Sequence, residues 1–238
     1  MTLSKTIKVA VVIPAYNEGS VIKEVVAGID AVFKKSKYAY QIVVVDDGSK
    51  DDTAKIAHST GAYVIQHILN SGSGGATATG LSYAQQNGFD IATTSDADGQ
   101  HDPKDVIRGV DEILKTKFDL LIGSRLIDTK GMAKVKVIGN KGLSIITMLL
   151  FRINVTDSQS GLRIFSKKAL NELKWKTSGY EFCSEMLWRA NQINLQIGEY
   201  PIKAIYTNYS LEKGQNNWNA FNIVRTLITR RIVELFSE

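Results

Sequence analysis

The chain has 238 residues, of which 44% are hydrophobic and 22% charged, a composition that fits one folded domain and excludes a disordered or fibrous protein. Its net charge of +5 indicates an anionic partner, which could be a nucleotide, a lipid phosphate, an acidic membrane or a nucleic acid. The single cysteine, Cys183, excludes an internal disulfide, and no apolar stretch approaches the roughly 20 residues of a membrane span.

Strand and helix patterns alternate through the first half of the chain. Short runs rich in β-branched residues predict buried strands at residues 7–13, 41–45, 62–66, 91–95 and 120–123. Helical patterns lie between them, at residues 20–34, 52–60, 76–87 and 103–117. The last of these follows Asp102 and Pro103, an N-cap and a proline at the first helical position. This alternation predicts a single α/β domain with a mainly parallel central sheet and helices on both faces.

The second half of the chain is less regular. Helical patterns cover residues 137–153, 181–192 and 220–236, residues 161–166 predict an edge strand, and residues 195–206 predict two short strands around Pro201. The last helix carries an apolar stripe with arginines on its shoulders, formed by Phe221, Val224, Ile228, Ile232 and Leu235. Such a helix can lie on a membrane surface or pack on the domain or in a dimer, and periodicity leaves these alternatives open.

Polar side chains follow three of the predicted strands where the strands end. Residues 14–18 read PAYNE, residues 46–49 read DDGS and residues 96–101 read DADGQH. Because a parallel sheet gathers functional residues at the carboxyl ends of its strands, these segments should lie along one rim. The alternative is a plain strand exit for residues 14–18 and a turn followed by a helix cap for residues 46–49.

Asp96 and Asp98 have the spacing of a cation site. Two carboxylates so placed can aim at one hard divalent cation, Mg²⁺ or Mn²⁺. An EF-hand is excluded, because His101 stands where its loop needs glycine and Ile107 where it needs glutamate. The alternative is an acidic turn before the capped helix, but two crowded carboxylates cost stability without a cation.

Residues 72–80 form a glycine-rich segment, GSGGATATG, which predicts a loop bordering a nucleotide phosphate. The segment is no Walker A loop, because Leu81 replaces the required lysine, and no dinucleotide fingerprint, because Thr77 replaces the third glycine. Close packing of a helix on the sheet is the alternative.

Six motifs in order carry a resemblance to a known family: PAYNE, VVVDDGSKDDT, NSGSGGATATGLSYA, SDADGQHDP, GSR and DSQSGLRIF. Together they resemble the inverting family 2 glycosyltransferases, most of all the branch with dolichyl-phosphate mannose synthases and bacterial polyprenyl-phosphate glycosyltransferases. The likeness covers about residues 7–214. It implies the GT-A fold, a nucleotide-binding α/β sandwich with an Asp-x-Asp metal motif. It also implies a catalytic domain at residues 1–214, followed by an amphipathic helix at residues 215–238.

The resemblance assigns roles to individual residues. It implies that the base and ribose of the donor contact Pro14, Tyr16, Glu18, Val45 and Asp47, and that Asp96 and Ala97 sit at the nucleotide. Asp98 and Gln100 match metal ligands. Three further residues match the reacting centre: Arg125 facing the donor phosphates, Asp157 as a nearby carboxylate, and Lys213 in a loop that closes over the diphosphate.

These assignments predict metal-dependent transfer, with inversion, from a UDP- or GDP-sugar to a polyprenyl phosphate such as an undecaprenyl or dolichyl phosphate. One alternative is transfer to a saccharide hydroxyl in polysaccharide assembly, with Asp157 as the general base. Another is a non-catalytic, nucleotide-sugar-binding subunit of a membrane complex. Nucleic-acid binding is not expected, because no recognised motif accompanies the basic charge.

The expected place of action is the inner face of the cytoplasmic membrane, reached from the cytoplasm without a span. The lone cysteine and the absence of a signal-peptide pattern favour the cytoplasm. The terminal helix, together with the apolar residues 143–151 between Lys141 and Arg152, would contact the membrane surface. A small membrane protein and a second copy of the chain are further expected partners.

Overall fold

The computed structural model describes residues 6–205, 224–226 and 228–229. Within them one seven-stranded sheet has the order β3-β2-β1-β4-β6-β5-β7. The strands are β1 (Lys8–Ala15), β2 (Ala39–Asp46), β3 (Tyr63–Gln66), β4 (Ile91–Thr94), β5 (Leu120–Ser124), β6 (Arg163–Ser166) and β7 (Ile197–Pro201). Only β6 runs antiparallel to its neighbours. The prediction of a single α/β domain with a mainly parallel sheet is confirmed.

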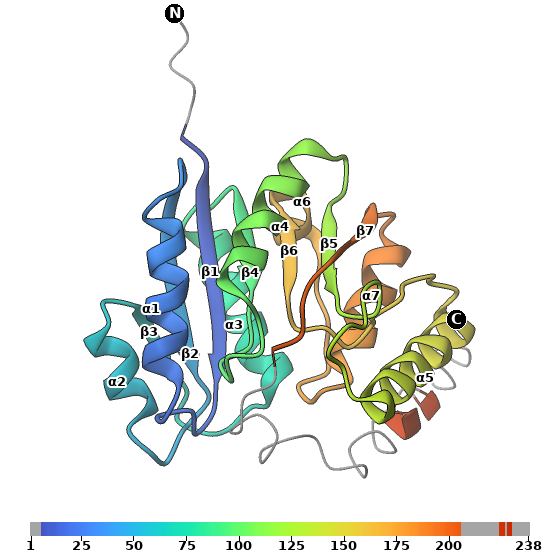
Figure 1. The fold of residues 1–238 in the computed structure, drawn as a ribbon, viewed down its shortest axis with the longest axis horizontal. Coiled ribbons are helices and arrows are strands. Elements are labelled where there is room, and N and C mark those ends of the chain that lie inside the picture. The colour runs from blue at the N-terminus through green and yellow to red at the C-terminus, as the bar shows by residue number, and fades with distance from the viewer. Residues whose placement is uncertain (1–5, 206–223, 227, 230–238) are drawn as a thin grey trace, which may run out of the picture.

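Helices cover both faces of the sheet (Figure 1). One face packs against α1 (Ile22–Phe33), α2 (Thr53–Ser59) and α4 (Pro103–Lys115). The other packs against α3 (Ser73–Gln86), α5 (Lys134–Phe151), α6 (Lys167–Glu172) and α7 (Phe182–Gln192). Successive strand residues point to opposite faces, so Val11 joins the first layer and Val12 the second. Because the strands carry apolar side chains on both faces, each face needs its own layer of helices to shield it from water.

Three predicted elements differ from the structure. Residues 161–166 do not form an edge strand, because β6 lies between β4 and β5. Helix α3 begins at Ser73 rather than at residue 76, so part of the glycine-rich segment is helical. Only one strand, β7, occupies the stretch around Pro201, and it ends at that proline, although the N–H of Ile202 still donates to the carbonyl of Ser124 on β5 at 2.9 Å. Ala204 then forms an isolated antiparallel bridge with His101.

The C-terminal prediction lies largely outside the described residues. Of the expected helix at residues 220–236, residues 224–226 and 228–229 are described, and they are helical. Lys213 and most of the apolar stripe fall outside the described part. Among the residues that the structure describes, no helix has both the length and the apolar character to cross a bilayer.

Candidate active site

The ends of β1 and β2 are joined by hydrogen bonds between the loops that follow them. The backbone N–H of Asn17 donates to Ser49 Oγ at 2.8 Å, and Asn17 Oδ1 accepts from the backbone N–H of Lys50 at 2.8 Å. The N–H of Glu18 donates to Thr53 Oγ1 at the start of α2. Strand β4 pairs with the other side of β1, so the three polar segments share one rim, at the lower edge of the sheet in Figure 1.

The residues expected to hold the nucleotide differ in what they offer a ligand. Tyr16 is exposed, and Pro14 is half-buried at the end of β1. Val45 and Ala97 are instead part of the two hydrophobic clusters, on opposite faces of the sheet. Their side chains pack in the core, so these two residues have only backbone groups to offer a nucleotide.

Asp47 organises the loop that follows β3. Its carboxylate accepts from the backbone N–H and the hydroxyl of Ser71, from the backbone N–H of Gly72 and from the imidazole of His67, at distances of 2.7–2.9 Å. Burial raises the pKa of Asp47, but the bonds from Ser71, His67 and Gly72 outweigh it, and the net effect lowers the pKa. The carboxylate is therefore charged at neutral pH and shapes the rim beside Tyr16 and Glu18.

Two glycines of residues 72–80, Gly74 and Gly80, pack closely against neighbouring segments. The N–H of Gly74 donates to the carbonyl of Ser178 at 2.7 Å, so this N–H in the first turn of α3 already has a protein acceptor. A Cβ on Gly74 would lie 2.7 Å from the carbonyl oxygen of Thr177, and one on Gly80 would collide with Val12. At the start of the segment Gly72 bonds to Asp47, and the expectation that the loop borders a nucleotide stays a prediction. Close helix packing, the alternative, describes Gly74 and Gly80.

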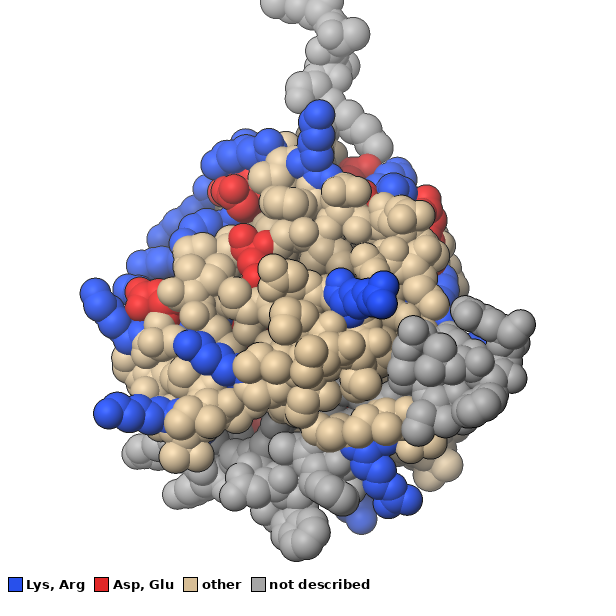
Figure 2. Space-filling model, turned by 90° about the vertical axis from the view of Figure 1, so that its right-hand side faces the viewer, with Lys and Arg blue, Asp and Glu red and all other residues tan. Residues whose placement is uncertain are grey.

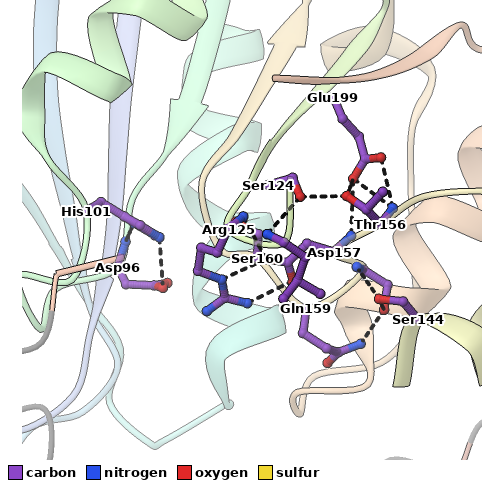
Figure 3. A network of polar contacts seen from close by, with 12 residues as sticks. Asp96, His101, Ser124, Arg125, Ser144, Thr156, Asp157, Gln159, Ser160 and Glu199 are labelled. Carbon is purple, nitrogen blue, oxygen red and sulfur yellow. Dashed lines mark hydrogen bonds and ion pairs between the residues drawn. The ribbon is translucent and has the colours of Figure 1, made fainter. Parts of the chain in front are cut away.

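Asp96 lies on the rim after β4 and is enclosed by residues that the motifs bring together. Its side chain is 43% exposed, yet protein atoms crowd around it, and this desolvation raises its pKa. His101 lies on one side, with Nε2 3.6 Å from Asp96 Oδ2. On another side is Gly161, where a Cβ would collide with the Asp96 carboxylate. The side chain extends in the direction of Arg125, whose positive charge acts on it (Figure 3).

Asp98 and Gln100 place two oxygen-bearing groups side by side. Asp98 Oδ1 accepts from the Gln100 backbone N–H at 3.0 Å, and the Gln100 side-chain amide donates to the same carboxylate. Burial and the negative charge of Asp96 raise the pKa of Asp98, so a cation would relieve this crowding. Carboxylate and amide oxygens suit Mg²⁺ or Mn²⁺.

The protein alone does not complete a coordination shell here. No cluster of three or more His, Cys, Asp or Glu suited to a metal ion occurs among the described residues. Mg²⁺ in proteins is often held by one or two carboxylates together with substrate phosphates and water. Asp98 and Gln100 thus fit a cation that arrives with, or is completed by, a bound diphosphate.

Arg125 and Asp157 form a buried ion pair instead of two separate groups. Arg125 Nε and Nη2 donate to the two Asp157 carboxylate oxygens at 2.7 and 2.8 Å, and the Arg125 backbone N–H adds a third bond at 3.1 Å (Figure 3). The Asp157 side chain is 0% exposed and that of Arg125 is 17% exposed. This geometry does not support the expectation of a general base, because both oxygens of Asp157 already accept from Arg125. Asp157 instead holds Arg125 beside Asp96.

The loop that carries Asp157 is fixed by two residues that the sequence reasoning did not single out. Glu199 on β7 accepts from the N–H groups of Thr156 and Asp157 at 2.8–3.1 Å. Arg163 is 1% exposed, and its guanidinium donates to the carbonyls of Ser158, Ser160 and Cys183. The sequence carried one signal for Arg163, because a charged residue within an otherwise apolar strand pattern indicates a buried charge that needs hydrogen-bond partners. Together these bonds hold the loop against Asp96.

The chain is similar to known proteins over most of its length. The family model described as Glycosyl transferase family 2 matches residues 10–174. The UDP-N-acetylglucosamine–dolichyl-phosphate N-acetylglucosaminyltransferase of Methanococcus voltae is 42% identical, over 91% of this chain and 93% of the relative. The undecaprenyl-phosphate mannosyltransferase of Micrococcus luteus is 28% identical, over 82% of each chain.

Among solved structures, the glucosyl-3-phosphoglycerate synthase of Mycobacterium tuberculosis, in complex with Mn²⁺, UDP and phosphoglyceric acid, has a TM-score of 0.71 at 22% identity. The match covers 94% of this chain and 78% of that one. At this identity the likeness shows the fold alone, and that fold is the GT-A fold expected from the motifs.

Proposed function

The chain belongs to the family 2 glycosyltransferases, and from this premise we propose that it transfers a sugar from a nucleotide-sugar to a polyprenyl phosphate. The observation that carries the proposal is the 42% identity, over nearly the full length of both chains, to a transferase named for a dolichyl phosphate. A more distant relative is named for a different sugar but again for a polyprenyl phosphate. The lipid phosphate is therefore the common element, and the sugar is the variable one.

The state of Asp157 favours a phosphate over a hydroxyl as the attacking group. A sugar hydroxyl must lose a proton as it attacks, so its transfer needs a general base. A phosphate monoester is already anionic and needs none. Asp157, the carboxylate expected to serve as that base, is buried and fully engaged with Arg125. With a lipid phosphate acceptor no general base is needed, so an Asp157 that is fully paired with Arg125 is compatible with the reaction.

The donor would lie along the rim formed by the ends of β1, β2 and β4. Tyr16, Glu18 and Asp47 border its nucleoside, and Asp96 lies toward its phosphates. Asp98 and Gln100 would hold Mg²⁺ or Mn²⁺ against the diphosphate, where the cation stabilises the charge of the leaving group. The relative named for UDP-N-acetylglucosamine supports a UDP-sugar donor.

The remaining residues complete an in-line displacement at the anomeric carbon, with inversion. Arg125 is held rigidly by Asp157, so its guanidinium is oriented before the substrates bind, and little ordering is needed in the transition state. Lys213 stays a prediction for a second cation near the leaving group. The carbon–oxygen bond to the nucleoside diphosphate breaks as an oxygen of the lipid phosphate forms the new bond, and no proton is transferred.

Helix α5 offers a surface on which the enzyme could meet a lipid acceptor. Four apolar side chains on it are 53–77% exposed: Val135, Ile138, Ile145 and Leu149. They recur at helical spacing and form one stripe, the α5 stripe. Lys134, Lys136 and Lys141 lie on the same helix, which contains no acidic residue. Apolar side chains flanked by lysines are typical of helices that lie in a bilayer interface.

The charge distribution on that side of the molecule agrees with a membrane contact. In Figure 2, Lys and Arg project from a largely uncharged surface, and the Asp and Glu side chains in view lie in its upper half. Helix α5 lies at the lower right of Figure 1, near the level of the strand ends. These features support work at a membrane surface, and the cytoplasmic face stays a prediction. A small membrane-protein partner and self-association stay predictions.

A donor screen tests the proposal. Purified protein is incubated with Mn²⁺, a polyprenyl phosphate and one radiolabelled UDP-, GDP- or dTDP-sugar at a time, and label is counted in the lipid extract. We expect label from one nucleotide series, UDP first, and none in excess EDTA. If label enters only added saccharides, the enzyme is a sugar-to-sugar transferase. If it enters no product with any donor, the chain is a binding subunit.

A further inference from the structure

A buried imidazole stands beside Asp96 and has no part in the chemistry described above. The side chain of His101 is 2% exposed. The turn that brings His101 back alongside Asp96 passes through Gly99, whose φ is 76°. Glycine is favoured there because it adopts this left-handed backbone conformation without strain. The placement of the ring is thus built into the sequence from Asp96 to His101.

The hydrogen bonds of the ring define which nitrogen carries its proton. The backbone N–H of Asp96 donates to His101 Nδ1 at 3.2 Å, and Ser95 Oγ lies 3.4 Å from the same nitrogen. A backbone N–H can only donate, so Nδ1 is the acceptor and the proton of the neutral ring sits on Nε2. Nε2 lies 3.6 Å from Asp96 Oδ2. The ring therefore accepts a hydrogen bond from the backbone of Asp96 with Nδ1, and its Nε2 faces the carboxylate at 3.6 Å, an electrostatic contact just beyond hydrogen-bond distance (Figure 3).

Both sides of this arrangement are held in place. Gly161 presses against the Asp96 carboxylate, and its carbonyl accepts from Thr94 Oγ1 at 2.6 Å. His101 itself is paired with Ala204 through the isolated bridge, and the neighbouring Ile205 N–H donates to the carbonyl of Gln100 at 3.1 Å. The two groups that contact the Asp96 carboxylate, Gly161 and His101, are thus each held by a backbone contact to another segment of the chain.

We propose that His101 is a positioning residue that fixes the orientation of the Asp96 carboxylate toward the nucleotide donor. The proposal rests on the proposed function, in which Asp96 meets the donor. A neutral N–H suits this task because it orients a carboxylate without cancelling its charge. The contrast is with Asp157, whose charge is neutralised by the bidentate contact with Arg125. His101 leaves the negative charge of Asp96 available to the cation that accompanies the diphosphate.

A double-mutant cycle on nucleotide binding tests whether His101 acts through Asp96. UDP is titrated in the presence of Mn²⁺ into the full chain and into His101→Ala, Asp96→Asn and the double variant. We expect His101→Ala to weaken UDP binding by about tenfold in the wild-type background and by less than about twofold in the Asp96→Asn background, since coupled residues are not additive. Equal weakening in both backgrounds would mean a general structural role and would overturn the proposal.

Two conservative variants separate the contacts of the ring and also serve if His101→Ala does not fold. Gln places its amide near the position of Nε2, and Asn places its amide near that of Nδ1. We expect His101→Gln to bind UDP within about threefold of the wild type and His101→Asn to bind as weakly as His101→Ala. The reverse order would refute orientation through the carboxylate. His58→Ala, at an exposed histidine of α2, is the control and should change nothing.

The outcomes also separate this inference from the proposed function. If Asp96→Asn weakens UDP binding and His101→Ala does not, the inference is wrong and the donor site stands. If Asp96→Asn binds UDP like the wild type, the assignment of Asp96 to the donor is wrong, and the role of His101 is refuted with it.

Discussion

Replacing Asp157 by alanine should destabilise the protein strongly, because it leaves Arg125 without its counter-charge. The substitution removes the acceptor of three hydrogen bonds, and the Arg125 side chain it leaves behind is only 17% exposed. Breaking a buried ion pair by deleting one partner costs about 3–5 kcal/mol. Partial rehydration of Arg125 favours the lower end, about 3 kcal/mol. In a domain of this size, about 3 kcal/mol lowers Tm by about 6–12 °C.

Thermal unfolding followed by circular dichroism measures this effect, with activity measured in parallel on the lipid phosphate acceptor. Asp157→Asn keeps the shape and one acceptor oxygen, so its loss of Tm should be smaller. Asp128→Ala, at an exposed aspartate a few residues from Arg125, is the matched control and should leave Tm unchanged.

A double variant, Arg125→Met with Asp157→Leu, separates stability from chemistry. Apolar replacement of both partners of a buried pair is often neutral, so most of the lost Tm should return. Activity should stay at least about a hundredfold below wild type, because the proposed function requires the cation of Arg125 beside the donor phosphates. The reasoning fails if Asp157→Asn keeps the wild-type Tm but loses turnover, with the difference from wild type large at neutral and high pH and shrinking at low pH, since that pattern belongs to a general base.

Three further predictions concern the metal, the rim and the membrane. Asp98→Asn should lower turnover by well over about tenfold at saturating donor and raise the Mn²⁺ concentration required, because the leaving group loses its counter-charge; full activity in excess EDTA would contradict this. Asp47 has a pKa below the usual carboxyl value of about 4, so it stabilises the fold above that pH, and the stabilisation is lost as pH falls through the lowered pKa. Asp47→Asn should therefore lower Tm at pH 7 by about 2–8 °C, with the difference from wild type shrinking below about pH 4 in a series of melts; a difference independent of pH would argue against a charged Asp47. The double variant Val135→Glu with Leu149→Glu should float with anionic liposomes several-fold less than the wild type. Tyr63→Glu, at an exposed residue on the opposite edge strand, is the control and should float like the wild type. Equal flotation of the wild type, the double variant and the control would exclude membrane contact through the α5 stripe.

The sequence predicted the rim because the rim is built from consecutive strand–helix units. Residues 14–18 and 46–49 follow strands whose apolar runs are plain in the sequence, and parallel pairing then brings their ends together. The N-cap at Asp102 was predictable for the same reason, since its signal is local: its side chain accepts from the N–H of Lys104.

The parts that sequence could not supply depend on long-range pairing. Nothing local indicates that β6 inserts antiparallel between β4 and β5, because four residues of strand pattern carry no information on their neighbours. Arg125 and Asp157 were both identified, but as separate groups, since their contact joins residues 32 positions apart. Close packing at Gly74 and Gly80 was one of two alternatives, and the sequence could not choose between them, because glycine serves both a phosphate loop and close packing.

The central claim is that the nucleophile is a lipid phosphate, and a matched pair of acceptors tests it most directly. The full chain is given Mn²⁺, a radiolabelled donor, and either a polyprenyl phosphate or the free polyprenol of the same chain length, and the initial rate of lipid labelling is measured. We predict rapid labelling of the polyprenyl phosphate and none of the polyprenol, which has the same lipid but a hydroxyl that must be deprotonated. Labelling of the polyprenol at a comparable rate, or labelling of neither lipid while a saccharide is labelled, would contradict the account.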